Sequence, residues 1–474
     1  GIRDSVASRG LGDVYKRQSL ALSMSMLLGF TACGANNNDT TTDNQPAQTE
    51  TANTDNADNK TEETSDSPAD KASDDKTSSN TDDGKIHLTY WYAWKDKIGE
   101  SKEELVKQFN ESQDEIVVEA AYQGSYDELS SKTQAAKAAN NAPEIFEVEI
   151  ASMYTMAKGG MIEDLTPFVD DELNLEDFNE GLMHEAYIDE NLYGLPFYRS
   201  TPIMYKNVDM LKAAGLDPEG PRDWKEFKEY AEKLRDKDND KYAMTFNLDP
   251  WFLEAWVYSS DGFYAQDGKI GFDQEGTREP ARFLQELADE DLIKVVLGEQ
   301  SGDTQRQDFV NQNSALYFTS TAGLSSLLPL AEENGFELDT SFVPGNKHYA
   351  VPTGGCNIVM TSGLDKEKQE ATWKFLKFMT ATDQNVFASE YTGYLPTRYS
   401  SVETDKIQKL HEEVPQYKTA FDQLEHAQAR PIAKGWPEME KMLYEGVTNT
   451  TTQGADVDQI YDNLQNQAQS ILSF

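Results

Sequence analysis

Ile86-His87-Leu88-Thr89-Tyr90-Trp91-Tyr92 has the alternating side chains that are typical of a β-strand. The polar string Ser101-Lys102-Glu103-Glu104 that follows has the spacing of a capping box and predicts the start of a helix. Further along, the pattern predicts a strand over 116–122, a helix over 125–139 and a strand over 144–150. Because strand and helix alternate, we expect an α/β domain with a mainly parallel sheet.

Helical patterns dominate the rest of the chain. Apolar residues from Trp224 to Leu234 recur at helical spacing and predict an amphipathic helix. Further helices are predicted over 280–290, 366–380, 437–445 and from 456 to the C-terminus. The folded part has about 390 residues, which is too long for one ordinary core and suits two lobes. Ligands of open α/β sheets bind at the carboxyl ends of strands and between domains, so we expect a cleft.

The N-terminal region predicts the location of the protein rather than its fold. The uncharged stretch from Ser19 to Ala32 is too short to span a bilayer comfortably and fits the apolar region of a secretory signal. Phe30-Thr31-Ala32-Cys33 resembles a bacterial lipobox, so residues 19–33 are expected to be a lipoprotein signal ending at a lipidated Cys33. The alternative is an ordinary cleaved signal with an incidental cysteine. Residues 1–18 resemble translated adapter sequence and are expected to be a non-native leader.

Charge separates a linker from the folded part. Residues 34–84 hold 13 acidic side chains, three lysines and no aromatic residue, so this segment is expected to be a disordered acidic linker. The whole chain carries a net charge of −42. An acidic protein lacks the clustered cations that phosphate backbones require, so nucleic acid is excluded as a partner. Anionic membranes would also repel it, which favours attachment through a lipid.

Motifs for catalysis and for metal or cofactor binding are absent from the sequence. We find no Walker loop, no dinucleotide fingerprint, no zinc-protease helix and no nucleophile elbow, so neither a catalytic residue nor a cofactor is predicted. Cys356 lies in an apolar run and is expected to be a small buried residue. The string 236–240 has the alternating acids of a calcium loop, but Lys241 and Asn247 replace the expected glycine and glutamate. No metal is therefore assigned, although calcium at this loop stays an alternative.

Aromatic residues are plentiful after the linker, and several lie in loop-like contexts. The flat face of an indole or a phenol matches the apolar face of a pyranose, while carboxylates and amides bind the hydroxyls. On this ground Trp251, Trp256 and Trp436 are candidate ligand contacts. Tryptophan and tyrosine side chains also pack in the hydrophobic core of any large domain, so a core position is the alternative for each of these three residues.

A set of ordered motifs resembles one protein family. Gly194-Leu195-Pro196-Phe197-Tyr198-Arg199-Ser200-Thr201-Pro202, Ala214-Gly215-Leu216-Asp217-Pro218 and Thr392-Gly393-Tyr394-Leu395-Pro396 are similar to segments of family 1 extracellular solute-binding proteins of ABC importers. Asn141-Ala142-Pro143 and Gly435-Trp436-Pro437 extend the resemblance over about residues 85–450. Within the family, the chain resembles the branch of glycerol-3-phosphate and sugar binders.

The resemblance implies a two-lobed, periplasmic-binding-protein-like fold of type II, with a ligand cleft between lobes that crossing hinge strands join. Lobe 1 would comprise 85–199 and 347–396, and lobe 2 would comprise 200–346 and 397–474. The resemblance also implies ligand contacts, which match these positions: Tyr126, Glu149, Ser200, Trp224, Ser320, Gly355 and Tyr394. For Trp224 the alternative is a core anchor of its helix.

One departure from the family pattern concerns phosphate. Where the glycerol-phosphate branch places an arginine, this chain has Trp436-Pro437-Glu438-Met439-Glu440, and an acid there would repel a phosphate. Arg398 and Arg430 are the candidates for a substitute cation, and the sequence places neither. We therefore expect a neutral carbohydrate ligand, with glycerol 3-phosphate or a glycerophosphodiester as the alternative and a secreted two-carboxylate glycosidase as a further one.

The expected protein is a monomeric surface lipoprotein. It would capture a mono- or oligosaccharide by lobe closure and deliver it to the transmembrane subunits of an ABC permease. Its expected location is the extracellular face of the cell membrane, in a Gram-positive type of envelope.

Overall fold

The computed structural model describes residues 84–298 and 300–474. The predicted leader (1–18), signal segment (19–33) and lipid anchor Cys33 lie outside the described residues, as does the predicted linker 34–84 except for Gly84. Among the helices of the described ranges, none is both long enough and apolar enough to cross a bilayer.

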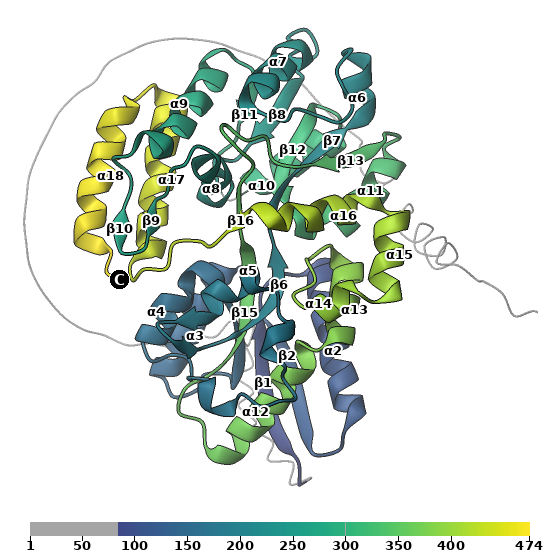
Figure 1. Ribbon diagram of the computed structural model, residues 1–474, viewed down its shortest axis with the longest axis vertical. Helices are drawn as coiled ribbons and strands as arrows, with labels where there is room; N and C mark the ends of the chain where they lie inside the picture. Colours follow the sequence, from purple (N-terminus) through teal and green to yellow (C-terminus); the bar gives the residue numbers. More distant parts are fainter. Residues whose placement is uncertain (1–83, 299) are drawn as a thin grey trace, which may run out of the picture. The chain divides into compact units, whose positions relative to one another are not determined.

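Two five-stranded sheets organise the described residues (Figure 1). The first sheet has the order β2-β1-β3-β15-β6. Four of these strands run in the same direction, and β15 runs against them. The first-sheet strands are β1 (Ile86–Tyr92), β2 (Ile116–Tyr122), β3 (Ile145–Glu149), β6 (Leu195–Ser200) and β15 (Gly354–Met360).

The second sheet repeats this arrangement with the order β11-β8-β12-β7-β13. Here β7 is the strand that runs against its neighbours β12 and β13, whereas β11, β8 and β12 are parallel. The second-sheet strands are β7 (Pro202–Asn207), β8 (Tyr242–Phe246), β11 (Ile293–Val295), β12 (Ser314–Ser320) and β13 (Leu338–Ser341). We refer to each sheet with its covering helices as the first half and the second half.

The α-helices are α2 (Asp96–Ser112), α3 (Tyr126–Ala138), α4 (Met153–Lys158), α5 (Glu180–Met183), α6 (Val208–Ala213), α7 (Trp224–Leu234), α8 (Pro250–Ser259), α9 (Glu275–Asp289), α10 (Ser301–Val310), α11 (Leu324–Glu333), α12 (Lys366–Met379), α13 (Thr382–Thr392), α14 (Tyr399–Val402), α15 (Asp405–Glu413), α16 (Pro415–Asp422), α17 (Trp436–Gln453) and α18 (Val457–Ile471). Short 3-10 turns are η1 (Ile150–Ser152), η2 (Thr166–Phe168), η3 (Leu175–Asp177), η4 (His184–Ala186), η5 (Thr321–Gly323) and η6 (Gln423–His426). Minor strands are β4 (Tyr187–Ile188), β5 (Asn191–Leu192), β9 (Ala265–Gln266), β10 (Lys269–Ile270), β14 (Val351–Pro352) and β16 (Ala427–Gln428).

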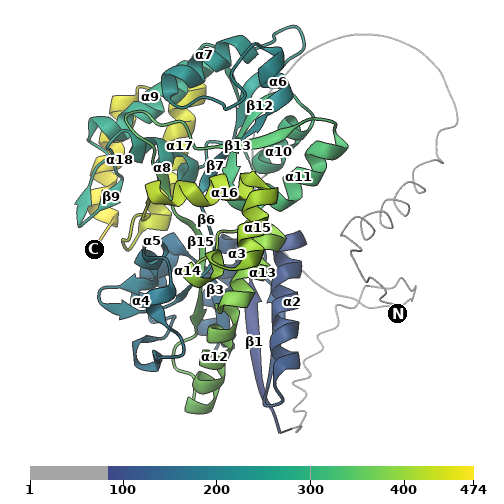
Figure 2. The ribbon, with the colours of Figure 1, turned by 45° about the vertical axis from the view of Figure 1, so that its right-hand side comes forward.

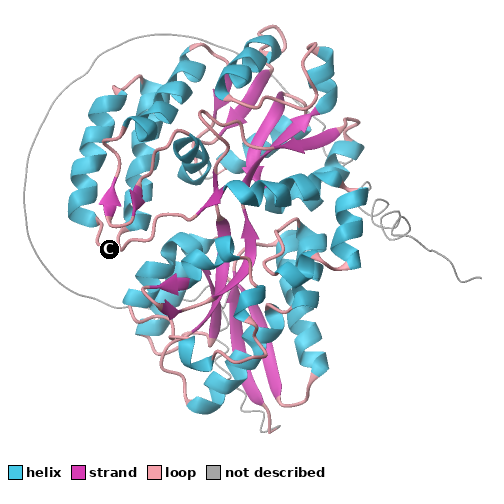
Figure 3. Ribbon diagram, in the orientation of Figure 1, coloured by secondary structure: helices cyan, strands magenta, loops and turns pink. Residues whose placement is uncertain are grey.

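The chain passes between the halves along three segments, which we call the three connections. The first connection is the direct continuation of β6 into β7 through Thr201. A second runs from β13 through β14 into β15. A third leaves α13 of the first half and runs through α14, α15, α16, which contacts β13, and β16 before it reaches α17 of the second half. β14 and β16 pair in parallel, so the second and third connections are hydrogen-bonded to each other. Figure 3 shows strands continuing from one half into the other through the middle of the view.

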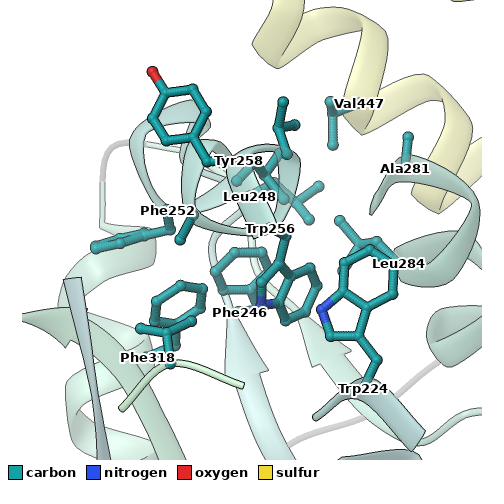
Figure 4. Packing of buried hydrophobic residues seen from close by; sticks show 14 of the residues in the cluster. Trp224, Phe246, Leu248, Phe252, Trp256, Tyr258, Ala281, Leu284, Phe318 and Val447 are labelled. Atoms are coloured by element: carbon teal, nitrogen blue, oxygen red, sulfur yellow. The ribbon is translucent and has the colours of Figure 1, made fainter. Parts of the chain in front are cut away.

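Each half has its own hydrophobic core. One cluster packs Tyr90, Phe109 and Phe375 between the first sheet and helices α2 and α12. In the second half, Trp256 packs against Trp224, Phe246 and Phe318, as Figure 4 shows. The C-terminal helices α17 and α18 complete this second core and lie beside α9 (Figure 2).

The predicted first-sheet strands are confirmed, and so is the helical pattern over 224–234. The prediction that a capping box starts a helix at Ser101 is wrong, because α2 begins at Asp96 after a turn with positive φ at Trp94 and Asp96. Ser101 lies inside that helix and instead donates to the Ile98 carbonyl oxygen at 2.8 Å. A complete capping box is present at Ser125, where α3 begins.

Two predicted helices have different bounds from those of the structure. The helix predicted over 280–290 begins at Glu275, so that Pro280 lies in its interior. The helix predicted over 437–445 continues to Gln453, where Gly454 ends it in the left-handed conformation. Cys356 is fully buried, as predicted, and its Sγ lies 3.1 Å from the Phe197 carbonyl oxygen.

Candidate functional site

Glu149 ends β3 at the carboxyl edge of the first sheet, and its side chain has two roles. Its Oε2 accepts a hydrogen bond from the Ala151 backbone N–H at 2.9 Å, which caps η1. Its Oε1 accepts one from Arg430 Nη1 at 2.8 Å. Arg430 lies in the third connection, just after β16. The predicted contact Glu149 therefore lies where the halves are joined.

Arg430 binds three carboxylates that come from both halves. Its Nη2 and Nε donate to Glu254 on α8, with a shortest distance of 2.8 Å. Nη2 also donates to Glu440 on α17 at 2.5 Å, and Nη1 binds Glu149 of the first half. The Arg430 side chain is 5% exposed and that of Glu254 is 0% exposed. We call Arg430, Glu149, Glu254 and Glu440 the Arg430 cluster.

The Arg430 cluster contains more negative than positive charge. Three carboxylates against one guanidinium leave two excess negative charges when all four groups are ionised. Burial raises the pKa of Glu254 to about 7, although the Arg430 charge opposes this increase. The pKa of Asp249, at the start of α8, is raised to about 6 by burial and by the charge of Glu440. The Arg430 cluster is therefore acidic, and its guanidinium is already paired with carboxylates.

Trp251 lies against the second connection. Its Nε1 donates to the Thr353 carbonyl oxygen at 2.9 Å, and its ring covers the Cα of Gly354. A Cβ added to Gly354 would lie 2.2 Å from Trp251 Cζ2 and 3.0 Å from Ser200 Oγ. Glycine is therefore required for this close approach, which brings the predicted contacts Trp251 and Ser200 together.

Gly355 and Ser320 lie beside the same strands. Gly355 has φ +90°, and a Cβ there would lie 2.0 Å from the Tyr198 carbonyl oxygen, so the backbone itself requires glycine. Ser320 ends β12 and is in register with Pro202, two residues beyond Ser200. Its Oγ accepts the Ala322 N–H at 3.2 Å, which caps η5. Both residues thus have local structural roles near the connections.

Tyr126 and Tyr394 lie near each other and near Cys356 in the first half. The hydroxyl of Tyr126 is buried, and among the described residues it finds no hydrogen-bond partner. Burial raises its pKa well above the ordinary value, and the nearby Cys356 and Tyr394 add to the increase. Trp94 packs edge-to-face on Tyr126 at 5.4 Å between ring centroids and is 39% exposed. The buried Tyr126 hydroxyl therefore lies next to an accessible indole.

Three predicted tryptophan contacts lie elsewhere. Trp224 stacks on Phe283 with 4.6 Å between ring centroids and is 9% exposed. This position fits the alternative that Trp224 anchors its helix in the core. Trp256 and Trp436 are both 0% exposed and belong to the same core cluster. Figure 4 shows Trp224 and Trp256 surrounded by apolar side chains. Their burial argues against the ligand contact that the sequence suggested, because in this conformation a ligand has almost no surface of them to touch.

The two arginines that the sequence left unplaced have different positions. Arg398 is buried in the first half, where it binds Asp177 and the carbonyl oxygens of Thr380 and Leu173. Arg430 instead lies beside Glu149. Sequence reasoning missed Asp249 and Glu254 as site residues. A usable signal was present at Asp249-Pro250, because an aspartate followed by proline marks a helix start, here just after β8.

The loop predicted as an alternative calcium site is a turn. Asp236 Oδ1 accepts the backbone N–H groups of Asp238 and Asn239, at 3.1 and 3.2 Å. Within 84–298 and 300–474, no group of three or more histidine, cysteine, aspartate or glutamate side chains is arranged to hold a metal ion.

Comparisons with known proteins identify the family. Residues 104–416 match the family model described as bacterial extracellular solute-binding protein. The sn-glycerol-3-phosphate-binding periplasmic protein UgpB of Salmonella typhimurium is 25% identical over 368 residues, which cover 73% of this chain and 82% of UgpB.

Solved structures share the fold. UgpB from Mycobacterium tuberculosis, in complex with glycerophosphocholine, superposes with a TM-score of 0.73 at 22% identity and covers 82% of this chain and 98% of its own. The cyclic alpha-maltosyl-1,6-maltose binding protein from Arthrobacter globiformis gives 0.70 at 19% identity, covering 82% and 99%. The match over residues 104–416, together with the two-sheet architecture, shows that this chain belongs to the bacterial extracellular solute-binding protein family.

Proposed function

We propose that this solute-binding protein captures a neutral carbohydrate between its two halves and delivers it to an ABC permease. The observation that carries the proposal is the state of Arg430. Its guanidinium donates to Glu149, Glu254 and Glu440, and these acids leave an excess of negative charge around it. A phosphate would have to displace a carboxylate from Arg430 and then lie beside the remaining ones, which is electrostatically unfavourable.

The same carboxylates that disfavour a phosphate can bind the hydroxyl groups of a sugar. An ionised carboxylate is a strong acceptor for a hydroxyl donor, and an indole face provides an apolar surface for a pyranose. Glu149 and Asp249 supply acceptors, and Trp251 and Trp94 supply indoles. We assign ligand contact to Tyr126, Glu149, Ser200, Trp251, Ser320 and Tyr394, with Gly355 as a backbone requirement.

The capture mechanism follows from the three connections. Segments that join two halves can bend, and a ligand that contacts both halves favours the closed arrangement over the open one. Lobe 1 (85–199 and 347–396) and lobe 2 (200–346 and 397–474) are the moving parts in this proposal. The closed form would be the one that docks on the transmembrane subunits of the permease.

The alternative ligand is glycerol 3-phosphate or a glycerophosphodiester. It is supported by the relatives, because the UgpB proteins bind such ligands, whereas other solved neighbours bind maltose, mannotriose or a cyclic maltosyl-maltose. The acidity of the Arg430 cluster favours the neutral sugar. Members of this family are binding proteins rather than enzymes, which disfavours the glycosidase.

A lipid anchor completes the proposal. Cys33 would carry the acyl chains, and 34–84 would tether the monomeric domain to the extracellular face of the membrane. Mass spectrometry of the mature N-terminus tests this part, since a diacylglyceryl adduct on Cys33 is expected and an unmodified Cys33 would remove the anchor.

A thermal-shift screen of the full chain tests the ligand class. A ligand that binds only the native state raises the midpoint of unfolding, by an amount that grows with concentration. Neutral mono- and oligosaccharides are expected to include at least one that raises it. A midpoint raised only by sn-glycerol 3-phosphate or glycerophosphocholine would support the alternative instead.

A further inference from the structure

Glu185 is a buried carboxylate that is not among the predicted ligand contacts, although its partners Thr353 and Arg430 bind Trp251 and Glu149. It belongs to η4 in the first half and is 0% exposed. Its Oε2 accepts a hydrogen bond from Arg199 Nη2 at 2.9 Å. Its Oε1 accepts one from Thr353 Oγ1 at 2.6 Å and another from the Arg430 backbone N–H at 3.1 Å. All three partners are themselves buried.

Each of these three partners belongs to a different connection. Arg199 lies in β6, two residues before Thr201, where the first connection enters the second half. Thr353 separates β14 from β15 in the second connection, and Arg430 follows β16 in the third. One carboxylate therefore bonds to a residue of each of the three connections. Figure 1 shows the label of β16 near those of β6 and β15 of the first sheet, toward the middle of the view.

Two partners of Glu185, Arg199 and Arg430, make further hydrogen bonds that link the connections and the halves. Arg199 Nε donates to the Gly354 carbonyl oxygen at 2.9 Å, which ties the first connection to the second. The side chain of Arg430 continues to Glu149 in the first half and to Glu254 in the second. A movement of the third connection would thus shift the guanidinium that holds the predicted ligand contact Glu149.

We propose that Glu185 is the positioning residue that makes the three connections bend as one unit and sets Arg430 against Glu149. The proposal goes beyond the proposed function and rests on it only where ligand binding is concerned. The mechanical part, which is the coupling of the connections, holds whatever the ligand is. Buried charged hydrogen bonds suit this role, because removing one partner leaves the others unpaired in a low-dielectric environment.

Hydrogen exchange of the full chain without ligand tests the coupling. Thr353→Val removes only the hydroxyl that donates to Glu185. We expect amide exchange to become at least about threefold faster in the peptides covering 195–201 and 427–431, as well as in the peptide covering 350–355. The first two segments do not contain the substitution, so a change there reports coupling through Glu185. Faster exchange confined to 350–355 would overturn the proposal.

Thr245→Val is the matched control. Thr245 is 1% exposed and donates to Asp308 Oδ2 at 2.8 Å, and Asp308 also binds Lys294, so the chemistry resembles that at Glu185. This group lies wholly in the second half. Its loss is expected to speed exchange near β8 and to leave the three connections unchanged. Equal effects of both substitutions on the connections would show general destabilisation and would overturn the proposal.

Glu185→Gln gives the stronger version of the test. It keeps the shape but removes the charge that binds Arg199, so exchange in all three connections is expected to rise by about tenfold or more. With any ligand found in the screen, the dissociation constant is expected to rise although Glu185 does not touch the ligand. If no sugar binds but exchange changes as expected, the coupling stands and the proposed function fails.

Discussion

Arg430 Nη1 donates to Glu149 Oε1 at 2.8 Å, and this bond joins the third connection to the carboxyl edge of the first sheet. The same guanidinium binds Glu254 and Glu440 of the second half. The Arg430 cluster is therefore a link between the halves, and in the proposed function its excess negative charge disfavours a phosphate ligand.

Arg430→Ala should destabilise the protein strongly. It leaves the buried carboxylate of Glu254 without its cation, and breaking a buried ion pair costs about 3–5 kcal/mol of unfolding free energy. Chemical denaturation at pH 7.5 measures the loss. Arg222→Ala is the control, because Arg222 is exposed and pairs with Glu226 on the surface, so little change is expected there. Equal effects of the two substitutions would contradict the buried cluster.

The stability of the protein should depend on pH through Glu254. Because burial raises its pKa from 4.5 to about 7, the folded state binds a proton that the unfolded state releases between these values. The contribution of Glu254 to the unfolding free energy is therefore greatest at low pH and decreases as pH rises through this window.

Glu254→Gln isolates this contribution, since glutamine cannot titrate. The difference in unfolding free energy between the native chain and the variant should favour the native chain less at pH 8 than at pH 5. Denaturation of both proteins across this range measures it. A difference that is constant with pH, or that increases, would show that the pKa of Glu254 is not raised.

Alanine substitution of Trp251 should mainly weaken ligand binding, whereas alanine substitution of Trp256 should mainly lower stability. Trp251 is partly buried against Gly354, so Trp251→Ala should weaken binding of a ligand by about tenfold or more, with a modest loss of stability. Trp256 is 0% exposed, so Trp256→Ala should cost about 3–5 kcal/mol of stability. Titration calorimetry and denaturation of both variants separate the two roles. Retained affinity in Trp251→Ala would remove this indole from the site.

Gly354→Ala should displace the Trp251 indole. The added Cβ would lie 2.2 Å from Trp251 Cζ2, so the ring must move and the ligand site must change. Gly302→Ala is the matched control, because a Cβ at Gly302 in α10 meets nothing within 4 Å and alanine favours a helix. Ligand affinity should fall only in Gly354→Ala, and an unchanged affinity there would contradict the packing of Trp251 at the site.

The sequence predicted the architecture better than the site. Strand alternation predicted β1, β2 and β3, because each strand's pattern is local and repeats every two residues. The start of α2 was missed because Trp94 and Asp96 adopt positive φ, which no local propensity favours. The positions of Trp224 and Trp436 could not be predicted, since an indole serves a core as well as a ligand.

The Arg430 cluster could not be predicted from the sequence, because only the fold brings its residues together. Its partners Glu149 and Glu254 are 281 and 176 positions away along the chain, so no spacing in the sequence predicts the cluster. Glu440 departs from the family pattern, and in the structure it accepts a hydrogen bond from the same guanidinium.

Calorimetric titration of the native chain and Glu440→Gln tests the central claim most directly. For the native chain at pH 7.5, we expect at least one neutral oligosaccharide to bind and sn-glycerol 3-phosphate to give no heat. Glu440→Gln removes one negative charge beside Arg430 and should increase affinity for the phosphate relative to the native chain. Tight binding of sn-glycerol 3-phosphate by the native chain, with no heat from any neutral sugar, would contradict the account.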